Sequence, residues 1–170
     1  MNDDLIRMYN EAIARIHDAD ILSSSNQSTS DSSSILRVLG FEILLKCAIK
    51  LCGQSYKSHH EYSKLWKALP GHASKEILSF AKLQSPGHTD FSNLERVLDA
   101  YKNVILNASG KSFKEQHDAG LEWEIKGFPI NDADVRYYPE ELYCLIEALK
   151  AYIKPKISKN DTPHRRRFEK

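Results

Sequence analysis

The chain lacks the short motifs and residue surpluses that mark the common enzyme classes. Its 170 residues include only 7 glycines, 6 prolines and 3 cysteines. No segment matches a glycine-rich phosphate-binding loop, a dinucleotide fingerprint, a nucleophile elbow, a zinc-protease helix or a paired Cys-x-x-Cys motif. These absences weigh against nucleotide hydrolases, nicotinamide-dependent dehydrogenases, α/β-hydrolases and zinc enzymes.

The cysteine count and the missing hydrophobic runs bear on where the protein works. Cys47, Cys52 and Cys144 form no disulfide framework, and an odd count suits a reducing compartment, so we expect a cytoplasmic protein. No apolar run reaches the roughly 20 residues that span a bilayer. The start, MNDDLIRMYN, has acids where a signal peptide would have basic residues. We expect no membrane association.

An excess of charge of one sign is absent as well. Lysine and arginine total 24 against 23 acidic residues, which gives a formal net charge of +1. Without a global field, any site for a polyanion has to be a local patch. His17 and Asp20 share a helix face as two metal ligands would, but no further ligands are identified. We therefore expect no metal site and no cofactor.

Apolar residues recur at helical spacing along the first two thirds of the chain. We expect a helix over about residues 3–22, then a serine-rich loop, then a nearly buried central helix, SSILRVLGFEILLKCAIKLCG, that ends at Gly53. HHEYSKLWKALP predicts a short helix that is stopped by Pro70. ASKEILSFAKL and DFSNLERVLDAYKNVIL predict two further helices.

The last third combines an irregular segment with a clear helix. Residues 107–134 are polar and break the helical pattern, which predicts a long loop. PEELYCLIEALKAYI predicts a final helix that starts near Pro139 and ends at Pro155. Residues 155–170, including HRRRF, predict a disordered basic tail. The predicted fold is an all-α single bundle of about five helices over residues 1–154, with a long irregular loop before the last long helix.

The inner stripes of three predicted helices supply the expected core. Their members are apolar, lie at helical spacing and should be largely buried in mutual contact. They are Leu39, Ile43, Leu44, Ile49, Leu98, Leu145 and Leu149.

The segment FEILLKCAIKLCGQSYKSHHEYSKLWKAL carries the most informative pattern. An apolar helix with a Glu-x-x-Leu-Lys core runs into a glycine, and a loop then leads to a His-acid-hydrophobic helix start. An Arg-Tyr pair precedes the last helix. This arrangement resembles the HEPN superfamily of small helical domains. The matching residues are Glu42, Leu45, Lys46, Gly53, His60, Glu61, Tyr62, Leu65 and Leu69, followed by Arg136 and Tyr137.

The resemblance implies a helical bundle, often dimeric, in nucleotide- or RNA-related systems. These include toxin–antitoxin modules, other prokaryotic defence systems and partners of nucleotidyltransferases. Many members are metal-independent endoribonucleases whose signature is an Arg followed after four to six residues by a His. This chain has no such pair, so the general acid–base imidazole is missing from its motif position. We therefore expect no catalytic residues and a non-catalytic module that binds nucleotide, RNA or a partner protein.

Four residues are the binding candidates: Lys46, His60, Arg136 and Tyr137. The lysine and the arginine would meet phosphate through charge-assisted hydrogen bonds, and the tyrosine would offer a stacking face. Structural alternatives stay open. Lys46 can extend from the core to solvent, and Arg136 with Tyr137 can seal the long loop against the last helix. His60 can satisfy backbone groups at the helix entry, face a ligand, or take part in metal binding or catalysis.

Two other functions also stay open. One is a metal-independent endoribonuclease with an atypical pair, in which folding brings Arg136 close to His60 or His117. The other is a purely structural subunit of a defence complex. The expected partners are a nucleotide or RNA, a cognate nucleotidyltransferase or antitoxin protein, and a second copy of the chain in a homodimer.

Overall fold

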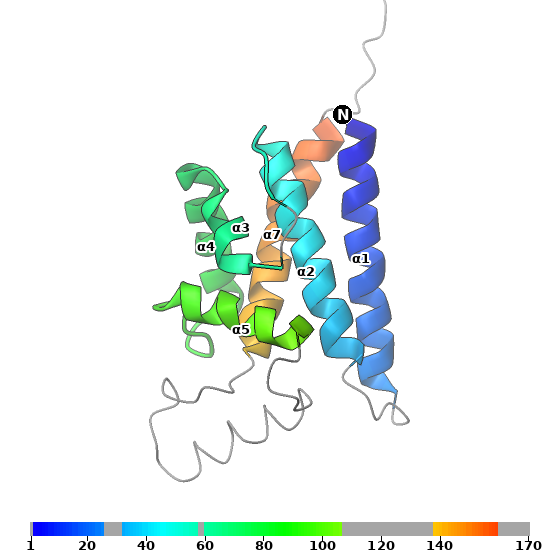
Figure 1. The fold of residues 1–170 in the computed structure, drawn as a ribbon, viewed down its shortest axis with the longest axis vertical. Coiled ribbons are helices and arrows are strands. Elements are labelled where there is room, and N and C mark those ends of the chain that lie inside the picture. The colour runs from blue at the N-terminus through cyan, green and yellow to red at the C-terminus, as the bar shows by residue number, and fades with distance from the viewer. Residues whose placement is uncertain (1, 26–31, 58–59, 107–137, 160–170) are drawn as a thin grey trace, which may run out of the picture.

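The computed structural model describes residues 2–25, 32–57, 60–106 and 138–159, and these residues are all-α. They form six helices and no strand, which confirms the predicted fold class (Figure 1). The helices are α1 (Asn2–Ser24), α2 (Ser32–Leu51), α3 (Tyr62–Lys67), α4 (Gly71–Gln84), α5 (Leu94–Leu106) and α7 (Pro139–Lys159). None of the described helices is both long enough and apolar enough to cross a membrane.

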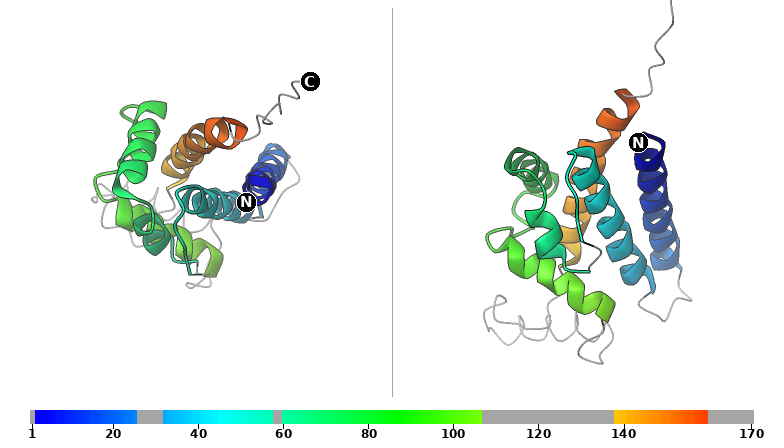
Figure 2. Two further views of the ribbon diagram at one scale, coloured as in Figure 1. Left: turned by 90° about the horizontal axis from the view of Figure 1, so that it is seen from above. Right: turned by 45° about the horizontal axis from the view of Figure 1, so that its top comes forward.

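Helix α2 is the centre of the bundle, as its apolar sequence predicts. It packs along α1 on one side and against α7 on another, and it also contacts α3 and α5. The remaining helix, α4, packs on α7 (Figures 1 and 2). A helix that touches neighbours on most sides cannot keep a polar face, which explains why the α2 sequence is apolar nearly all round.

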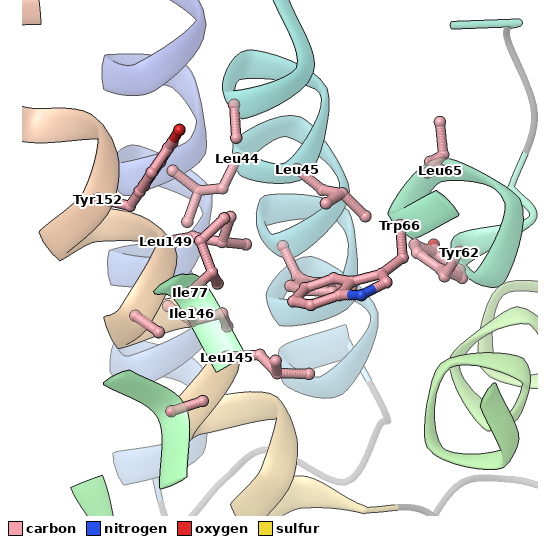
Figure 3. Close-up of a cluster of buried hydrophobic side chains, with 14 of the residues drawn as sticks. Leu44, Leu45, Tyr62, Leu65, Trp66, Ile77, Leu145, Ile146, Leu149 and Tyr152 are labelled. Atoms are coloured by element: carbon pink, nitrogen blue, oxygen red, sulfur yellow. The ribbon is translucent and has the colours of Figure 1, made fainter. Parts of the chain in front are cut away.

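The core is one cluster of buried side chains to which all six described helices contribute. Figure 3 shows Leu44 and Leu149 facing each other between α2 and α7, with Trp66 entering from α3. Five of the seven predicted core residues are buried: Leu44, Ile49, Leu98, Leu145 and Leu149. The other two, Leu39 and Ile43, are only half-buried, because they lie at the margin of the α2 contacts.

A glycine allows the close packing of α1 against α2. A Cβ atom on Gly40 would lie 2.6 Å from Ile16 Cγ1 and 3.2 Å from the Ala12 carbonyl oxygen. Ala12 and Ala19 on the facing helix are fully buried. Small side chains on both helices therefore set the short distance between them.

The predicted end of α2 is confirmed at Gly53. This residue has φ +71°, a left-handed conformation that glycine adopts without the steric cost of a Cβ. Its N–H donates to the Lys50 carbonyl at 2.9 Å, and the Gln54 N–H donates to the Ile49 carbonyl at 3.1 Å. These two bonds form a Schellman motif, which directs the chain away from α2 and into the loop before α3.

The predicted end of the last helix at Pro155 is wrong, because α7 continues to Lys159 with Pro155 inside it. A proline removes one helical hydrogen bond, here the donor to the Ala151 carbonyl. Ala151 is exposed, so water can donate a hydrogen bond to its carbonyl. The next carbonyl, that of Tyr152, accepts a hydrogen bond from the Lys156 ammonium at 3.2 Å. Residues 160–170 lie outside the described residues, so the disordered tail stays a prediction there.

Candidate functional site

A buried carboxylate joins α2 to the start of α3. Glu42 is only 5% exposed, yet it accepts three hydrogen bonds. Lys46 Nζ lies 2.6 Å from Oε1, while His60 Nδ1 at 2.8 Å and the Tyr62 hydroxyl at 3.0 Å meet Oε2. We call these four residues the Glu42 cluster. All four belong to the sequence pattern that resembles the HEPN superfamily.

The cluster keeps its carboxylate ionised. Burial by itself raises the pKa of Glu42, but the hydrogen bonds from Lys46, His60 and Tyr62 outweigh it, and the pKa lies below its usual value. Burial and the neighbouring Glu42 charge raise the pKa of the Tyr62 phenol. The phenol therefore stays protonated at neutral pH and remains a hydrogen-bond donor.

Lys46 is held on two sides. Its spacing from Glu42 predicts a helical ion pair, and the 2.6 Å contact confirms it. Its ammonium also lies 5.5 Å from the centroid of the Tyr56 ring, within the range of a cation–π contact. The Lys46 side chain is only 15% exposed. A phosphate at Lys46 would have to compete with the Glu42 carboxylate.

His60 contacts a buried side chain of α2. Its ring contacts the Glu42 carboxylate instead of backbone groups at the helix entry. A carboxylate can only accept, so Nδ1 carries the proton in this contact. The other ring nitrogen, Nε2, is then free of the Glu42 bond, and half of the side chain is exposed. His59 lies outside the described residues.

A small pocket opens between the loop after α2 and the face of α3. Its volume is about 170 Å³, and we call it the lysine pocket. Two lysines, a serine and a tyrosine supply its polar groups, and a leucine and an alanine complete the lining. The lining residues are Ser55, Tyr56, Lys57, Lys64, Leu65 and Ala68.

The charge around the lysine pocket is positive. Lys57 makes no hydrogen bond or ion pair with any described residue. Lys64 pairs with Glu61 Oε2 at 2.6 Å, and Lys102 from α5 approaches Oε1 of the same carboxylate at 3.6 Å. The lining therefore carries two lysines and no carboxylate, and Glu61 contacts one of these lysines from outside the lining. This is the local patch that a chain with almost no net charge needs in order to attract an anion.

The Glu42 cluster supports both walls of the lysine pocket. Lys46 reaches Tyr56 on the loop wall. His60 and Tyr62 fix the start of α3, which carries the opposite wall. The pocket is therefore built on a buried, hydrogen-bonded carboxylate, so its two walls are positioned by the core.

A larger hollow on α1 has the wrong charge for an anion. Its volume is about 510 Å³, and the described residues that line it include Asp3, Arg7 and Glu11. Arg7 already pairs with Asp4 at 2.6 Å. Two carboxylates and one paired guanidinium repel phosphate, so this hollow is a poor candidate for the predicted ligands.

Neither Cys47 nor Asp20 is free to react in the described part of the chain. Cys47 is fully buried, and burial raises the pKa of its thiol to about 11, so it is not a thiolate at neutral pH. Asp20 pairs with Arg37 at 2.7 Å. No group of three or more potential metal ligands is found among the described residues.

The remaining sequence candidates lie outside the described residues. These are Arg136, Tyr137 and His117. The residue that follows the Arg-Tyr pair is described and well anchored, because the Tyr101 hydroxyl donates to the Tyr138 carbonyl at 3.0 Å in a buried contact. The entry to α7 is therefore fixed against α5.

Sequence reasoning missed the residues of the lysine pocket. Ser55, Tyr56 and Lys57 are consecutive in the loop after Gly53, and Lys64 follows on α3. A lysine in the loop and another on the helix that follows it were the available signal, but only folding brings them to one pocket. Comparisons of the chain with known protein families, curated proteins and solved structures find no match.

Proposed function

We propose that this protein is a HEPN-like, non-catalytic module that binds a nucleotide or RNA through a phosphate group in the lysine pocket. The observation that carries the proposal is the convergence of Lys57 and Lys64, from different segments, on one small cavity with a hydroxyl at its edge. Ammonium groups bind phosphate through charge-assisted hydrogen bonds, which are stronger than neutral ones. A cytoplasmic role in a toxin–antitoxin or other prokaryotic defence system accords with the sequence resemblance.

The pocket dimensions restrict how such a ligand is held. Pockets that enclose a drug-sized molecule usually measure about 300–1,000 Å³. At about 170 Å³, the lysine pocket is too small for a whole nucleotide and has room for a phosphate group. The sugar and base would then lie largely outside it. Binding should therefore be weak, sensitive to salt and nearly independent of base sequence.

Fluorescence anisotropy with a labelled single-stranded RNA tests the proposal. We expect weak binding at low salt that declines as salt rises, because phosphate neutralisation releases counterions. Lys57→Gln should weaken binding about fivefold or more. Lys154→Gln is the matched control, because it removes an exposed lysine from α7 outside the pocket lining and should change little. Equal losses of affinity in both variants would show that RNA does not bind in the lysine pocket. No binding at low salt would favour a structural subunit.

One observation favours the endoribonuclease alternative. The buried Glu42 carboxylate holds His60 Nδ1 at 2.8 Å, which leaves Nε2 as the nitrogen able to take up a proton. Acid–base histidines of hydrolytic triads are oriented by a carboxylate in this way. Cleavage also needs a cation that stabilises the phosphorane. A lysine of the lysine pocket or Arg136 would have to supply this cation.

An RNA cleavage assay in EDTA distinguishes the two functions. We expect no cleavage of tRNA or single-stranded RNA above background at micromolar protein, since the chain lacks the Arg/His spacing of the metal-independent enzymes. A His60→Ala variant should then behave as the unmodified protein does. Robust cleavage that disappears in His60→Ala or Arg136→Ala would establish the endoribonuclease instead.

A further inference from the structure

We infer that the lysine pocket selects a terminal phosphate monoester over an internal phosphodiester. This inference rests on the proposed function, since it concerns which phosphate of a nucleotide or RNA enters the same pocket. Three features carry it: the excess of positive charge, the arrangement of donors on two walls, and the small volume.

The charge excess matches a dianion better than a monoanion. The pocket lining holds two ammonium groups, those of Lys57 and Lys64, and no carboxylate. Glu61 lies outside the lining, where it contacts Lys64 at 2.6 Å and is approached by Lys102 at 3.6 Å. A phosphate monoester carries about −1.5 to −2 charges at pH 7, whereas each internal phosphodiester carries a single charge. The monoester therefore gains more from the same lysines.

The donors of the pocket suit three terminal oxygens. Ser55 and Lys57 lie on the loop wall, and Lys64 lies on the α3 wall. A monoester has three oxygens free to accept hydrogen bonds, and it can present them to both walls at once. An internal phosphodiester has two such oxygens, and its other two carry the chain in opposite directions.

The volume of the pocket penalises an internal phosphate further. A phosphodiester brings a sugar on each side, and about 170 Å³ cannot enclose both. A chain end brings one sugar, which can stay outside the pocket. Lys46 lies over the Tyr56 ring at 5.5 Å, so the lining aromatic is already engaged by a cation. Discrimination should therefore depend on the chain end and little on the base.

Three RNA oligonucleotides of one sequence, each with an internal fluorophore, test the inference. One has a 5′-phosphate, one a 3′-phosphate, and one has hydroxyls at both ends. We expect at least one phosphorylated RNA to bind about tenfold more tightly than the unphosphorylated one, and the two phosphorylated arms identify which end is read. Lys57→Gln should reduce this preference at least threefold, while Lys154→Gln should preserve it.

Every outcome decides between the claims. Equal binding of the three RNAs, with a loss in Lys57→Gln, would overturn the terminal-phosphate inference and leave the proposed function standing. A preference that Lys57→Gln leaves unchanged would place the selection outside the lysine pocket and overturn the inference. No binding of any RNA at low salt would overturn the inference and the proposed function together. Thermal melts of each variant establish that it is folded before the binding is compared.

Discussion

Glu42 joins three parts of the molecule at a single carboxylate. It pairs with Lys46 on its own helix, with His60 at the end of the loop, and with Tyr62 in the first turn of α3. Burying a charge is costly unless it is paired and hydrogen-bonded, and here all three partners are present. Loss of the carboxylate would leave a nearly buried ammonium without its partner.

Glu42→Ala should therefore destabilise the protein by about 3 kcal/mol, the scale for removing one member of a buried, charged network. Urea unfolding followed by circular dichroism measures this change. Glu76→Ala is the matched control, because Glu76 is 46% exposed and meets Lys156 at 3.4 Å, and exposed pairs contribute little. If the two variants unfolded at the same urea concentration, Glu42 would not be a structural hub.

The same carboxylate predicts a dependence of stability on pH. The pKa of Glu42 lies below its usual value of 4.5 in the folded state, so its contribution to stability is fully present above about that pH. The contribution is lost as the pH falls through the lower, folded-state pKa. The stability difference between the unmodified protein and Glu42→Gln should accordingly shrink on acidification. Urea unfolding at several pH values checks this, and a difference that grows in acid would contradict it.

The sequence predicts part of this cluster and misses the rest for a physical reason. Glu42 and Lys46 are four apart on one helix, so helical geometry alone brings them together. His60 and Tyr62 lie 18 and 20 residues from Glu42. Their meeting depends on the path of the loop after Gly53, which local spacing does not determine. The family resemblance singled out these residues, but it did not supply their contacts.

At the scale of elements, the contact between α1 and α2 depends on the absence of a side chain at Gly40. A methyl group there would come within 3.2 Å of the Ala12 carbonyl and within 2.6 Å of Ile16 Cγ1. The Ile16 side chain can rotate, but the α1 backbone can move only if the helices separate. Overpacking of this kind typically costs about 1–3 kcal/mol.

Gly40→Ala should therefore lower the melting temperature, and Gly71→Ala provides the comparison. A Cβ atom on Gly71 would have no heavy atom within 4 Å, and this residue opens α4, where alanine is a better helix former. The second variant should melt at or above the temperature of the unmodified protein. Differential scanning calorimetry measures both, and equal melting temperatures would show that the helices do not pack this closely.

Helix existence was predictable from the sequence, but helix ends were less so. Apolar spacing predicted the described helices. The end of α2 at Gly53 was also predictable, because it depends only on the left-handed backbone conformation that glycine adopts easily. Pro155 did not end α7, since a proline in the last turns of a helix leaves an exposed carbonyl that water can serve. The core stripe was also predicted, apart from Leu39 and Ile43, whose burial depends on where neighbouring helices cross α2.

At the scale of the whole molecule, the property to test is assembly. The resemblance to HEPN domains predicts a homodimer. Light scattering coupled to size-exclusion chromatography should then give a mass near twice the chain mass of 19.4 kDa. A mass of one chain that does not change with concentration would reject the dimer. It would also remove the composite site on which an atypical endoribonuclease most depends.

The central claim is that phosphate binds in the lysine pocket, and nuclear magnetic resonance tests it most directly. Titrating AMP into the ¹⁵N-labelled protein reports on each backbone amide separately. We predict shifts concentrated at residues 55–57 and 64–68, which form the two walls of the pocket, and much smaller shifts in Lys57→Gln. Shifts concentrated along α1 or α4, or no shifts at millimolar AMP and low salt, would contradict the claim.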